Sequence, residues 1–311
     1  MKWMNVVLGV VLSVGVAGQA PLHPTLDQVS YWGDIPDLAA RIPVLQKEAA
    51  GGTRNSALLL GCAYQTAAGV ERDYRKAAEW YTKAAHAGIP LAQSRLGLLY
   101  LTGSGVKRDY GAAHMWLLRA ASQDEPAAES NLGYIYRYGV GVPVDAAQAV
   151  RWTTKAADQG MPAAQSNLAD LYELGEGVEK NFAKALSYYR KAAEAKFGPA
   201  ENGLGFVYQY GEGVAPDSSQ SAQWFRRAAD HGSVAGTFNL AIAYEGGRGI
   251  QQDYSEAIRL YRAAALAGSA LAQRRLAVMY ANGIGVAKDV DEAALWQQRL
   301  AASQSGVPTT E

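Results

Sequence analysis

The sequence is poor in cysteine and in histidine, with one and four residues respectively. The lone cysteine, Cys62, can form no disulfide within the chain, so no disulfide framework stabilises the fold. No histidine has a second histidine or a cysteine at ligand spacing, which argues against a zinc site. Cys62 also has no adjacent histidine or arginine in the sequence to lower its pKa, so we interpret it as a small apolar residue packed in a helix and not as a reactive thiol.

The sequence also lacks an excess of either charge, with 29 basic and 29 acidic residues that are interspersed along the chain. Proteins that bind nucleic acid usually present a basic patch or stripe. Blocks of like charge, which are typical of disordered tails, are absent as well. The composition therefore predicts a folded chain whose partner is not a nucleic acid.

Long hydrophobic runs are missing except at the N-terminus, where residues 6–17 are apolar or small and follow the positive charge of Lys2. Small residues come next, at Ala17, Gly18 and Ala20. This layout is typical of a cleavable signal peptide, and the run is shorter than the about 20 residues of a spanning helix. We expect residues 1–20 to be a signal peptide and the protein to be exported to the periplasm or secreted, with no stable membrane span after cleavage. An uncleaved membrane anchor is the alternative.

A repeat of 36 residues dominates what the sequence does contain. Three series of residues keep this spacing. The first is Tyr64, Tyr100, Tyr136, Tyr172, Tyr208, Tyr244 and Tyr280; the second is Gly69, Gly105, Gly141, Gly177, Gly213, Gly249 and Gly285; the third is Asp73, Asp109, Asp145, Asn181, Asp217, Asp253 and Asp289. A fixed period of this size indicates a solenoid, and solenoids usually function by presenting a surface.

Each repeat is predicted to be a pair of antiparallel helices. Pro90 suits the first turn of one helix, and Gly103 suits the left-handed conformation that ends it. Asp109 has the side chain to cap the second helix. The glycine two residues after Gly103 recurs in all seven repeats, which indicates a backbone constraint such as a positive φ. We expect this constraint at Gly141.

The predicted fold is therefore all-α: a right-handed α/α superhelical solenoid of seven 36-residue repeats over residues 57–303. The phase extends upstream, because Asp37 lies one period before Asp73 and Ala49 one period before Ala85. We expect residues 21–56 to form an irregular segment followed by a capping helix at 37–51, and residues 304–311 to be a polar tail.

The repeated motifs resemble the Sel-1-like repeat family, which is related to the tetratricopeptide repeats. The family pattern is Leu-Gly-x-x-Tyr, Gly-x-Gly-Val, Asp-x-x-x-Ala and Trp-Tyr-x-Lys-Ala-Ala. Residues 79–85 and 208–214 match it almost letter for letter. The resemblance implies an α/α superhelix that acts as a scaffold for protein–protein contacts. Bacterial members include exported regulators and assembly factors, linked to envelope signalling, exopolysaccharide secretion or host contact.

We therefore predict an exported scaffold that binds a protein or peptide partner on its concave face, with no cofactor and no enzymatic activity. One alternative is an envelope scaffold for exopolysaccharide or cell-wall machinery. A minor alternative is a β-lactam-binding or hydrolysing enzyme, because cysteine-rich relatives are so described. The single Ser-x-x-Lys match, Ser104 to Lys107, lacks the companion motifs, and the lone cysteine departs from the cysteine-rich pattern.

The predicted binding surface follows from the first helix of each repeat. Leu96 and Tyr100 are expected to face the core, which leaves positions 94, 98, 101 and 102 and their equivalents to line a groove. The residue types at these positions vary between repeats and include aromatic side chains, which are typical of binding hot spots when exposed. The predicted partner-binding residues are Tyr134, Tyr138, Asp170, Glu173, Phe206 and Tyr210. The alternative is that these aromatic side chains only pack between neighbouring repeats.

Overall fold

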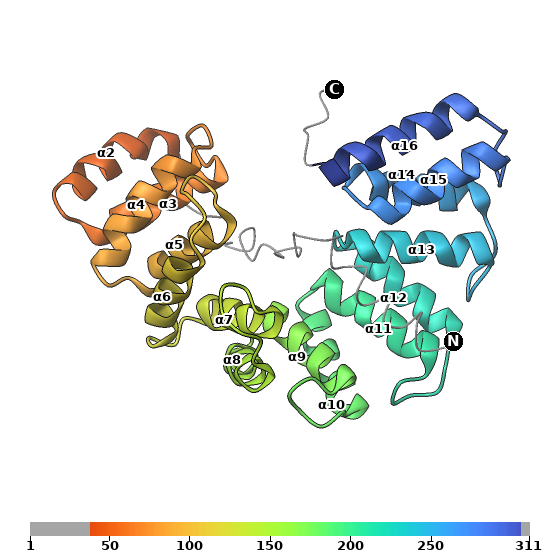
Figure 1. Ribbon diagram of the computed structural model, residues 1–311, viewed down its shortest axis with the longest axis horizontal. Helices are drawn as coiled ribbons and strands as arrows, with labels where there is room; N and C mark the ends of the chain where they lie inside the picture. The colour runs from red at the N-terminus through yellow and green to blue at the C-terminus, as the bar shows by residue number, and fades with distance from the viewer. Residues whose placement is uncertain (1–37, 306–311) are drawn as a thin grey trace. The chain divides into compact units, whose positions relative to one another are not determined.

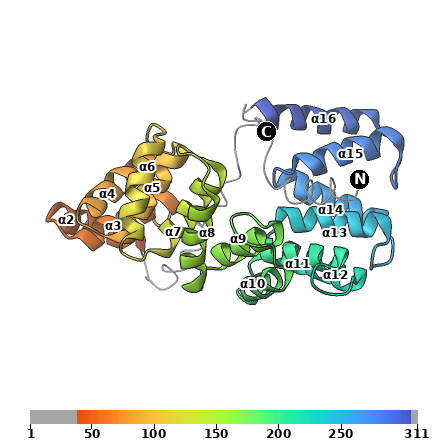
Figure 2. The same ribbon diagram turned by 60° about the horizontal axis from the view of Figure 1, so that its bottom comes forward.

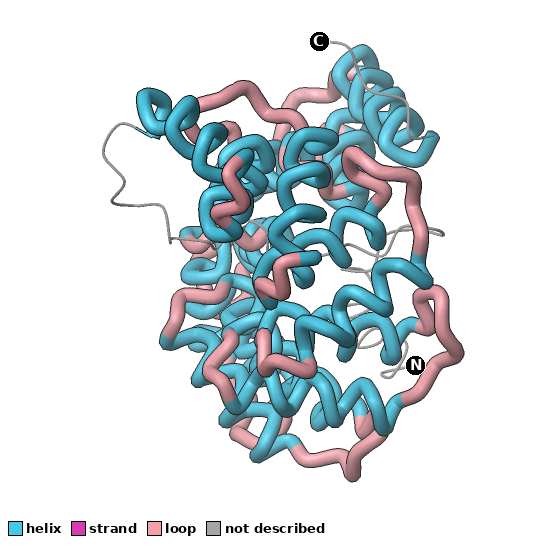
Figure 3. Tube along the Cα trace, turned by 90° about the vertical axis from the view of Figure 1, so that its left-hand side faces the viewer, coloured by secondary structure: helices cyan, strands magenta, loops and turns pink. Residues whose placement is uncertain are grey.

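The computed structural model describes residues 38–305 and the side chains of 39–302. The predicted signal peptide, the irregular segment after it and most of the predicted tail lie outside the described residues. The described part of the chain contains 15 α-helices and no strand, joined by short loops (Figures 1 and 3). The prediction of an all-α solenoid is therefore confirmed.

The helices fall into two compact units, an N-terminal unit that ends at Asn181 and a C-terminal unit that begins at Phe182. The N-terminal unit contains α2 (Leu38–Ala50), α3 (Arg54–Thr66), α4 (Tyr74–His86), α5 (Pro90–Thr102), α6 (Tyr110–Ala121), α7 (Pro126–Tyr138), α8 (Ala146–Asp158) and α9 (Pro162–Leu174). The C-terminal unit contains α10 (Phe182–Glu194), α11 (Gly198–Tyr210), α12 (Ser218–Asp230), α13 (Val234–Gly246), α14 (Tyr254–Leu266), α15 (Ala270–Asn282) and α16 (Val290–Ser305). Within each unit, consecutive helices pack against one another (Figure 2).

The helix ends form where the sequence places the capping residues. The side chain of Asp109 accepts a hydrogen bond from the backbone N–H of Ala112, which satisfies one of the free donors at the start of α6. Equivalent bonds start α4, α8, α12, α14 and α16, where the capping residues are Asp73, Asp145, Asp217, Asp253 and Asp289. Gly103 ends α5 at a φ of 74°. Local capping residues therefore mark the starts of these second helices and the end of α5.

The recurring loop glycine is the point where one repeat rests on the previous one. Gly141 has a φ of 73°, so the expected backbone constraint is confirmed. A Cβ atom at Gly141 would overlap the Cβ of Tyr110, the first residue of α6. At Gly105 the overlap would be with the backbone carbonyl of Tyr74. The absence of a side chain thus lets each loop lie directly on the start of the preceding second helix.

A second set of glycines lies inside the helix pairs, where the missing side chain leaves room for a large residue of the partner helix. A Cβ at Gly61 would lie 2.5 Å from the ring of Tyr81, which is fully buried. A Cβ at Gly97 would lie 2.8 Å from Leu117, which is also fully buried. In the Leu-Gly pair of the motif, the leucine is buried, and the glycine leaves room for a large side chain of the second helix.

The helix α2 covers the N-terminal end of the array. Ile42, Leu45 and Ala49 are buried in the same hydrophobic cluster as Leu60 of α3. Pro43 lies inside α2. The first helix of the array, α3, starts at Arg54, before the predicted boundary at residue 57, and α16 continues to Ser305.

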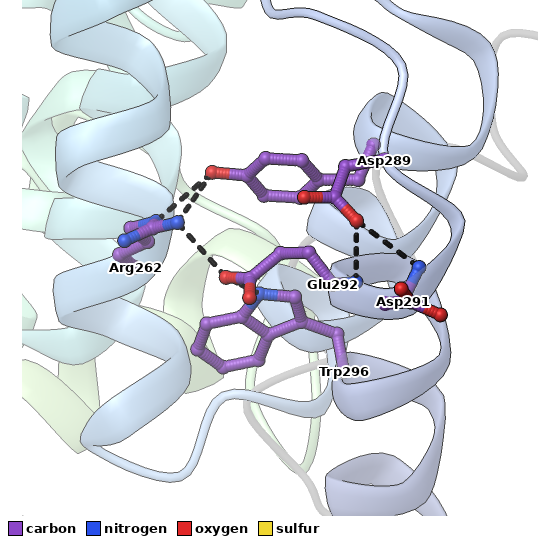
Figure 4. Close-up of polar contacts among 6 residues, drawn as sticks. Arg262, Asp289, Asp291, Glu292 and Trp296 are labelled. Atoms are coloured by element: carbon purple, nitrogen blue, oxygen red, sulfur yellow. Dashed lines mark hydrogen bonds and ion pairs between the residues drawn. The ribbon is translucent and has the colours of Figure 1, made fainter.

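Polar contacts join successive repeats in the C-terminal unit. The guanidinium of Arg262 in α14 donates to the hydroxyl of Tyr280 in α15 and forms an ion pair of 2.8 Å with Glu292 of α16 (Figure 4). The indole N–H of Trp296 donates to the same carboxylate at 3.1 Å. Arg226 reaches the hydroxyl of Tyr244 in the same way, one repeat earlier. The motif tyrosine thus links its repeat to the second helix of the repeat before.

Among the described helices, none combines the length and the apolar character that crossing a bilayer requires.

Candidate partner-binding surface

The six predicted binding residues lie in the two units, and each unit is described by itself. Tyr134 and Tyr138 lie on α7, and Asp170 and Glu173 lie on α9, all within the N-terminal unit. The other two, Phe206 and Tyr210, lie on α11 of the C-terminal unit. We refer to Tyr134, Arg137, Tyr138 and Asp170 as the N-terminal patch, and to Phe206 and Tyr210 as the C-terminal patch.

Two tyrosines form the aromatic part of the N-terminal patch. Tyr134 and Tyr138 are one helical turn apart, and their ring centres are 4.8 Å apart. Tyr138 is 41% exposed, whereas Tyr134 is half-buried. Burial, with smaller contributions from Tyr138 and Tyr110, raises the pKa of Tyr134 to about 12. Both hydroxyls are therefore neutral hydrogen-bonding groups at neutral pH, and the ring of Tyr138 is open to a partner.

Arg137 supplies the charge in this patch, and the sequence analysis did not single it out. Its NH1 is 3.7 Å from a carboxylate oxygen of Asp170, and its Nε donates to Glu176 at 2.7 Å. The guanidinium carbon lies 5.3 Å from the ring centre of Tyr138, within cation–π range. Burial disfavours the charged guanidinium, but Asp170 and Glu176 outweigh this and raise the pKa of Arg137. The sequence contained a signal for Arg137, because residue 137 is the third-repeat equivalent of position 101, one of the predicted groove positions.

The remaining predicted groove positions are not uniformly open. Glu173 is 5% exposed, so its carboxylate offers little surface to a partner. Ser94, Leu98 and Leu101 of the second repeat are buried as well. These three side chains are therefore not open to a partner, contrary to the expectation for their positions. Exposure at these positions therefore differs from repeat to repeat.

The C-terminal patch combines one packed ring with one open ring. The rings of Phe206 and Tyr210 are nearly parallel, at 8°, with their centres 6.1 Å apart. The other side of Phe206 meets Phe225 of α12 in an edge contact at 5.3 Å. Phe206 is half-buried and Tyr210 is 41% exposed. Phe206 therefore supports the position of Tyr210, which is the accessible residue of the two.

Residues 38–305 contain no group of three or more histidine, cysteine, aspartate or glutamate residues placed to hold a metal ion. Cys62 is 3% exposed. Burial raises its pKa and outweighs smaller effects of Tyr81 and Arg95, so the thiol stays protonated at neutral pH and packs as an apolar residue.

Comparisons with known proteins identify the repeat. A sequence profile of the Sel1 repeat matches seven consecutive segments: 55–89, 90–125, 126–161, 162–197, 198–233, 234–269 and 270–305. No functionally curated protein matches the sequence significantly.

Solved structures agree with the sequence match. A protective antigen of uropathogenic Escherichia coli with an SLR fold is 36% identical over 84% of this chain, with a TM-score of 0.64. The chain spans 56% of the length of that antigen. A Sel1 repeat protein from Oxalobacter formigenes is 36% identical, with a TM-score of 0.63, over 88% of this chain and 78% of its own.

A more distant likeness concerns the fold alone. An immunity protein from Pseudomonas aeruginosa is 21% identical over 70% of this chain and 82% of its own, with a TM-score of 0.50. Seven matched repeats that cover most of the chain, together with two relatives at 36% identity, are sufficient to assign the family. The chain belongs to the Sel1 repeat family.

Proposed function

We propose that this protein is an exported scaffold that binds a protein or peptide partner through the first helices of its repeats. The observation that carries the proposal is the N-terminal patch, where the exposed ring of Tyr138 lies beside the paired charges of Arg137, Asp170 and Glu176. An exposed aromatic ring bordered by charged groups is typical of a binding hot spot. The Sel1 repeat family supports the same conclusion, since its repeats generally mediate protein interactions.

The geometry also favours a preorganised surface. Arg137 is held by two carboxylates and by the ring of Tyr138, so its side chain loses little conformational freedom when a partner binds. The open face of Tyr138 is available for apolar contact, and the carboxylates of Asp170 and Glu176 can accept hydrogen bonds. A partner that combines an apolar side chain with hydrogen-bond donors would match this surface.

The binding test starts with affinity capture from an envelope extract of the native organism, followed by a direct titration of the captured partner. Changing Tyr138→Ala and Tyr210→Ala together should weaken binding about tenfold, which corresponds to roughly 1.4 kcal/mol. The helical circular-dichroism signal and the melting temperature should hold, because both rings are substantially exposed.

Met115→Ala is a matched control for the binding test. Met115 is 40% exposed but lies on α6, a second helix. Its truncation should leave affinity unchanged. Equal affinity for the wild type and the double tyrosine variant, or equal losses in the control and the double variant, would remove the assignment of the surface to the first helices.

The export part of the proposal rests on residues 1–20 of the sequence. It is tested by expressing the full chain in a bacterial host with an outer membrane and measuring the intact mass of the protein in each cell fraction. Cleavage near residues 17–20 and recovery from the periplasm or the medium would support export. A full-length mass confined to the cytoplasmic fraction would contradict it.

A further inference from the structure

The loop of the third repeat differs from the other six loops because it carries no charged residue. Residues 139–144 read Gly-Val-Gly-Val-Pro-Val, whereas each equivalent loop contains at least one charged side chain. At the position of Val144, the first two repeats carry Arg72 and Arg108. Val144 is 67% exposed, so packing within the array does not account for an apolar residue at this position.

Two exposed tyrosines adjoin this loop. Tyr110 is 38% exposed and begins α6, where a Cβ on Gly141 of the loop would overlap its own Cβ. Tyr138 is 41% exposed and ends α7. The next residue is Gly139, and a Cβ there would lie 2.9 Å from the side chain of Val144. We refer to Tyr110, Tyr138 and Val144 as the apolar patch.

Tyr134 connects the two tyrosines of the apolar patch. Its ring centre is 4.8 Å from that of Tyr138. Tyr110 is close enough to contribute, after burial and Tyr138, to the raised pKa of Tyr134. The three rings and Val144 therefore belong to one region of the N-terminal unit. Single exposed apolar residues are normal on a protein surface, but adjoining ones bordered by polar groups mark interaction sites.

A carboxylate with an open oxygen borders the apolar patch. Oε2 of Glu176 accepts from Nε of Arg137 at 2.7 Å, and Arg137 also lies over the ring of Tyr138. Oε1 of Glu176 has no hydrogen bond or ion pair with any described residue, and the side chain is 42% exposed. Asp170 is a second carboxylate at Arg137. One positive and two negative groups give this border a net negative charge.

We infer that the apolar patch and Glu176 bind a peptide segment of a partner protein that carries apolar side chains next to a lysine or an arginine. The inference rests on the proposed function, because it names the kind of partner for the N-terminal patch and extends the contact to Tyr110 and Val144. The apolar side chains of the peptide would cover the apolar patch. Its cation would bind Oε1 of Glu176, and hydrogen bonds between charged groups are stronger than those between neutral groups.

The charge of the border selects this partner over two others. An acidic peptide would bring like charges together at Glu176 and Asp170, and so would the surface of an anionic membrane. Such like-charge contacts oppose binding and favour the complementary partner. A basic and apolar peptide matches both the rings and the free carboxylate oxygen.

Fluorescence anisotropy with defined peptides tests the inference. The probe is a hexapeptide, Ile-Ile-Gly-Lys-Gly-Gly, with blocked ends and a fluorophore. One counterpart has glutamate in place of the lysine, and another has serine in place of both isoleucines. The wild type should bind the lysine peptide about tenfold more tightly than either counterpart. No binding of the lysine peptide, or equal affinity for all three peptides, would overturn the inference.

Val144→Arg tests the apolar part of the site. It should weaken binding of the lysine peptide about tenfold, and the fold should hold because the first two repeats carry arginine at this position. Val44→Arg is the matched control, since Val44 is 53% exposed on α2 and lies outside the apolar patch. Equal affinities of the two variants for the lysine peptide would contradict the assignment.

Glu176→Gln tests the charged part of the site. It should reduce the preference for the lysine peptide over the glutamate peptide about fivefold, because the amide keeps the shape and removes the charge. Asp158→Asn is the control: Asp158 is exposed at the end of α8, whereas the loop that contains Glu176 rests on Ala146 at the start of α8. An unchanged preference in Glu176→Gln would overturn the inference.

The same variants separate this inference from the proposed function. If the captured partner binds less tightly to the variant with Tyr138→Ala and Tyr210→Ala, but normally to Val144→Arg and Glu176→Gln, the proposed function stands and this inference fails. Weaker binding to all three variants supports both. Co-sedimentation with vesicles of phosphatidylethanolamine and phosphatidylglycerol provides the last arm. Sedimentation of the wild type that is lost in Val144→Arg would assign the apolar patch to a lipid surface and overturn the peptide assignment.

Discussion

Single residues set the contacts between repeats. The loop glycines, and the few other residues that adopt positive φ, show this most directly. Gly105 and Gly88 both have positive φ, at 71° and 86°. Only at Gly105 would an added Cβ meet backbone, that of Tyr74, whereas Gly88 has no atom within 4 Å of such a Cβ. The two glycines therefore separate the cost of the backbone conformation from the cost of the contact between repeats.

Gly88→Ala should lower the free energy of unfolding by about 1 kcal/mol, because alanine disfavours positive φ. Gly105→Ala should lower it by about 3 kcal/mol, since the Cβ also forces two backbone segments apart. Urea unfolding of both variants measures the difference. Equal losses would show that the close approach between repeats is relieved without cost.

Three residues other than glycine adopt positive φ in the described residues, namely Ala67, Asp124 and Lys196. Ala67 ends α3 at a φ of 61°. Ala67→Gly and Lys196→Gly should each raise the free energy of unfolding by about 1 kcal/mol, because glycine removes the steric cost. Ala68→Gly, at the neighbouring position with negative φ, is the control and should not stabilise. A loss of stability in both test variants would contradict this account.

At the scale of helices, an aspartate caps the second helix of every repeat except the fourth, and polar contacts join the repeats of the C-terminal unit. The ion pair of Glu245 and Arg275 connects α13 with α15, and Tyr261 of α14 shares it. Burial raises the pKa of Glu245, but the bonds from Arg275 and Tyr261 prevail and lower it, so this cluster stabilises the fold when the carboxylate is charged. Its contribution is present above the pKa of an unfolded glutamate and is lost as the pH falls through the lower folded value.

Glu245→Gln should therefore reduce the free energy of unfolding at pH 7 by about 2 kcal/mol, as expected for a hydrogen bond to a charged group. The difference from the wild type should shrink below about pH 4, near the pKa of an unfolded glutamate. Chemical unfolding from pH 3 to pH 7 checks both statements. Glu194→Gln, at an exposed position of α10, is the control. A difference that stays constant across this pH range would rule out the linkage.

At the scale of the whole molecule, stability is a sum of contacts between neighbours in the series. Consecutive helices pack together within each unit, and each repeat depends on the next for a complete core. Leu60 of α3 and Leu276 of α15 are both fully buried, one in each unit. Truncating one of them should affect nearby repeats and leave the distant ones unchanged.

Leu60→Ala should cost about 3 kcal/mol, because it leaves a cavity. Amide hydrogen exchange followed by mass spectrometry should accelerate in α2 to α5 and not in α13 to α16. Leu276→Ala should give the reverse pattern. Equal acceleration of all helices in either variant would show that the chain unfolds as one cooperative unit, against the expectation for a solenoid.

Parts of the candidate site were predictable from the 36-residue repeat, because the motif assigns each residue a position on its helix. The exposure of Tyr138 agrees with the expectation from its place in the motif. Tyr134 was expected to line the same groove and is half-buried. Burial of Leu98 and Glu173 was not predictable from the motif, because equivalent positions differ in exposure between repeats, as Leu98 and Tyr134 do. The pairing of Arg137 with Asp170 and Glu176 depends on residues 33 and 39 positions away in the sequence.

The family, the helical repeat and the helix ends follow from the sequence alone, because caps such as Asp109 and breakers such as Gly103 act on atoms within a few residues. Which side chains remain open, and which charges find partners, depends instead on how the helices pack. Arg275 and Arg95 occupy the same position of the motif, yet only Arg275 meets a carboxylate. The physical reason is that burial and ion pairing depend on three helices at once, and each repeat fills those positions differently.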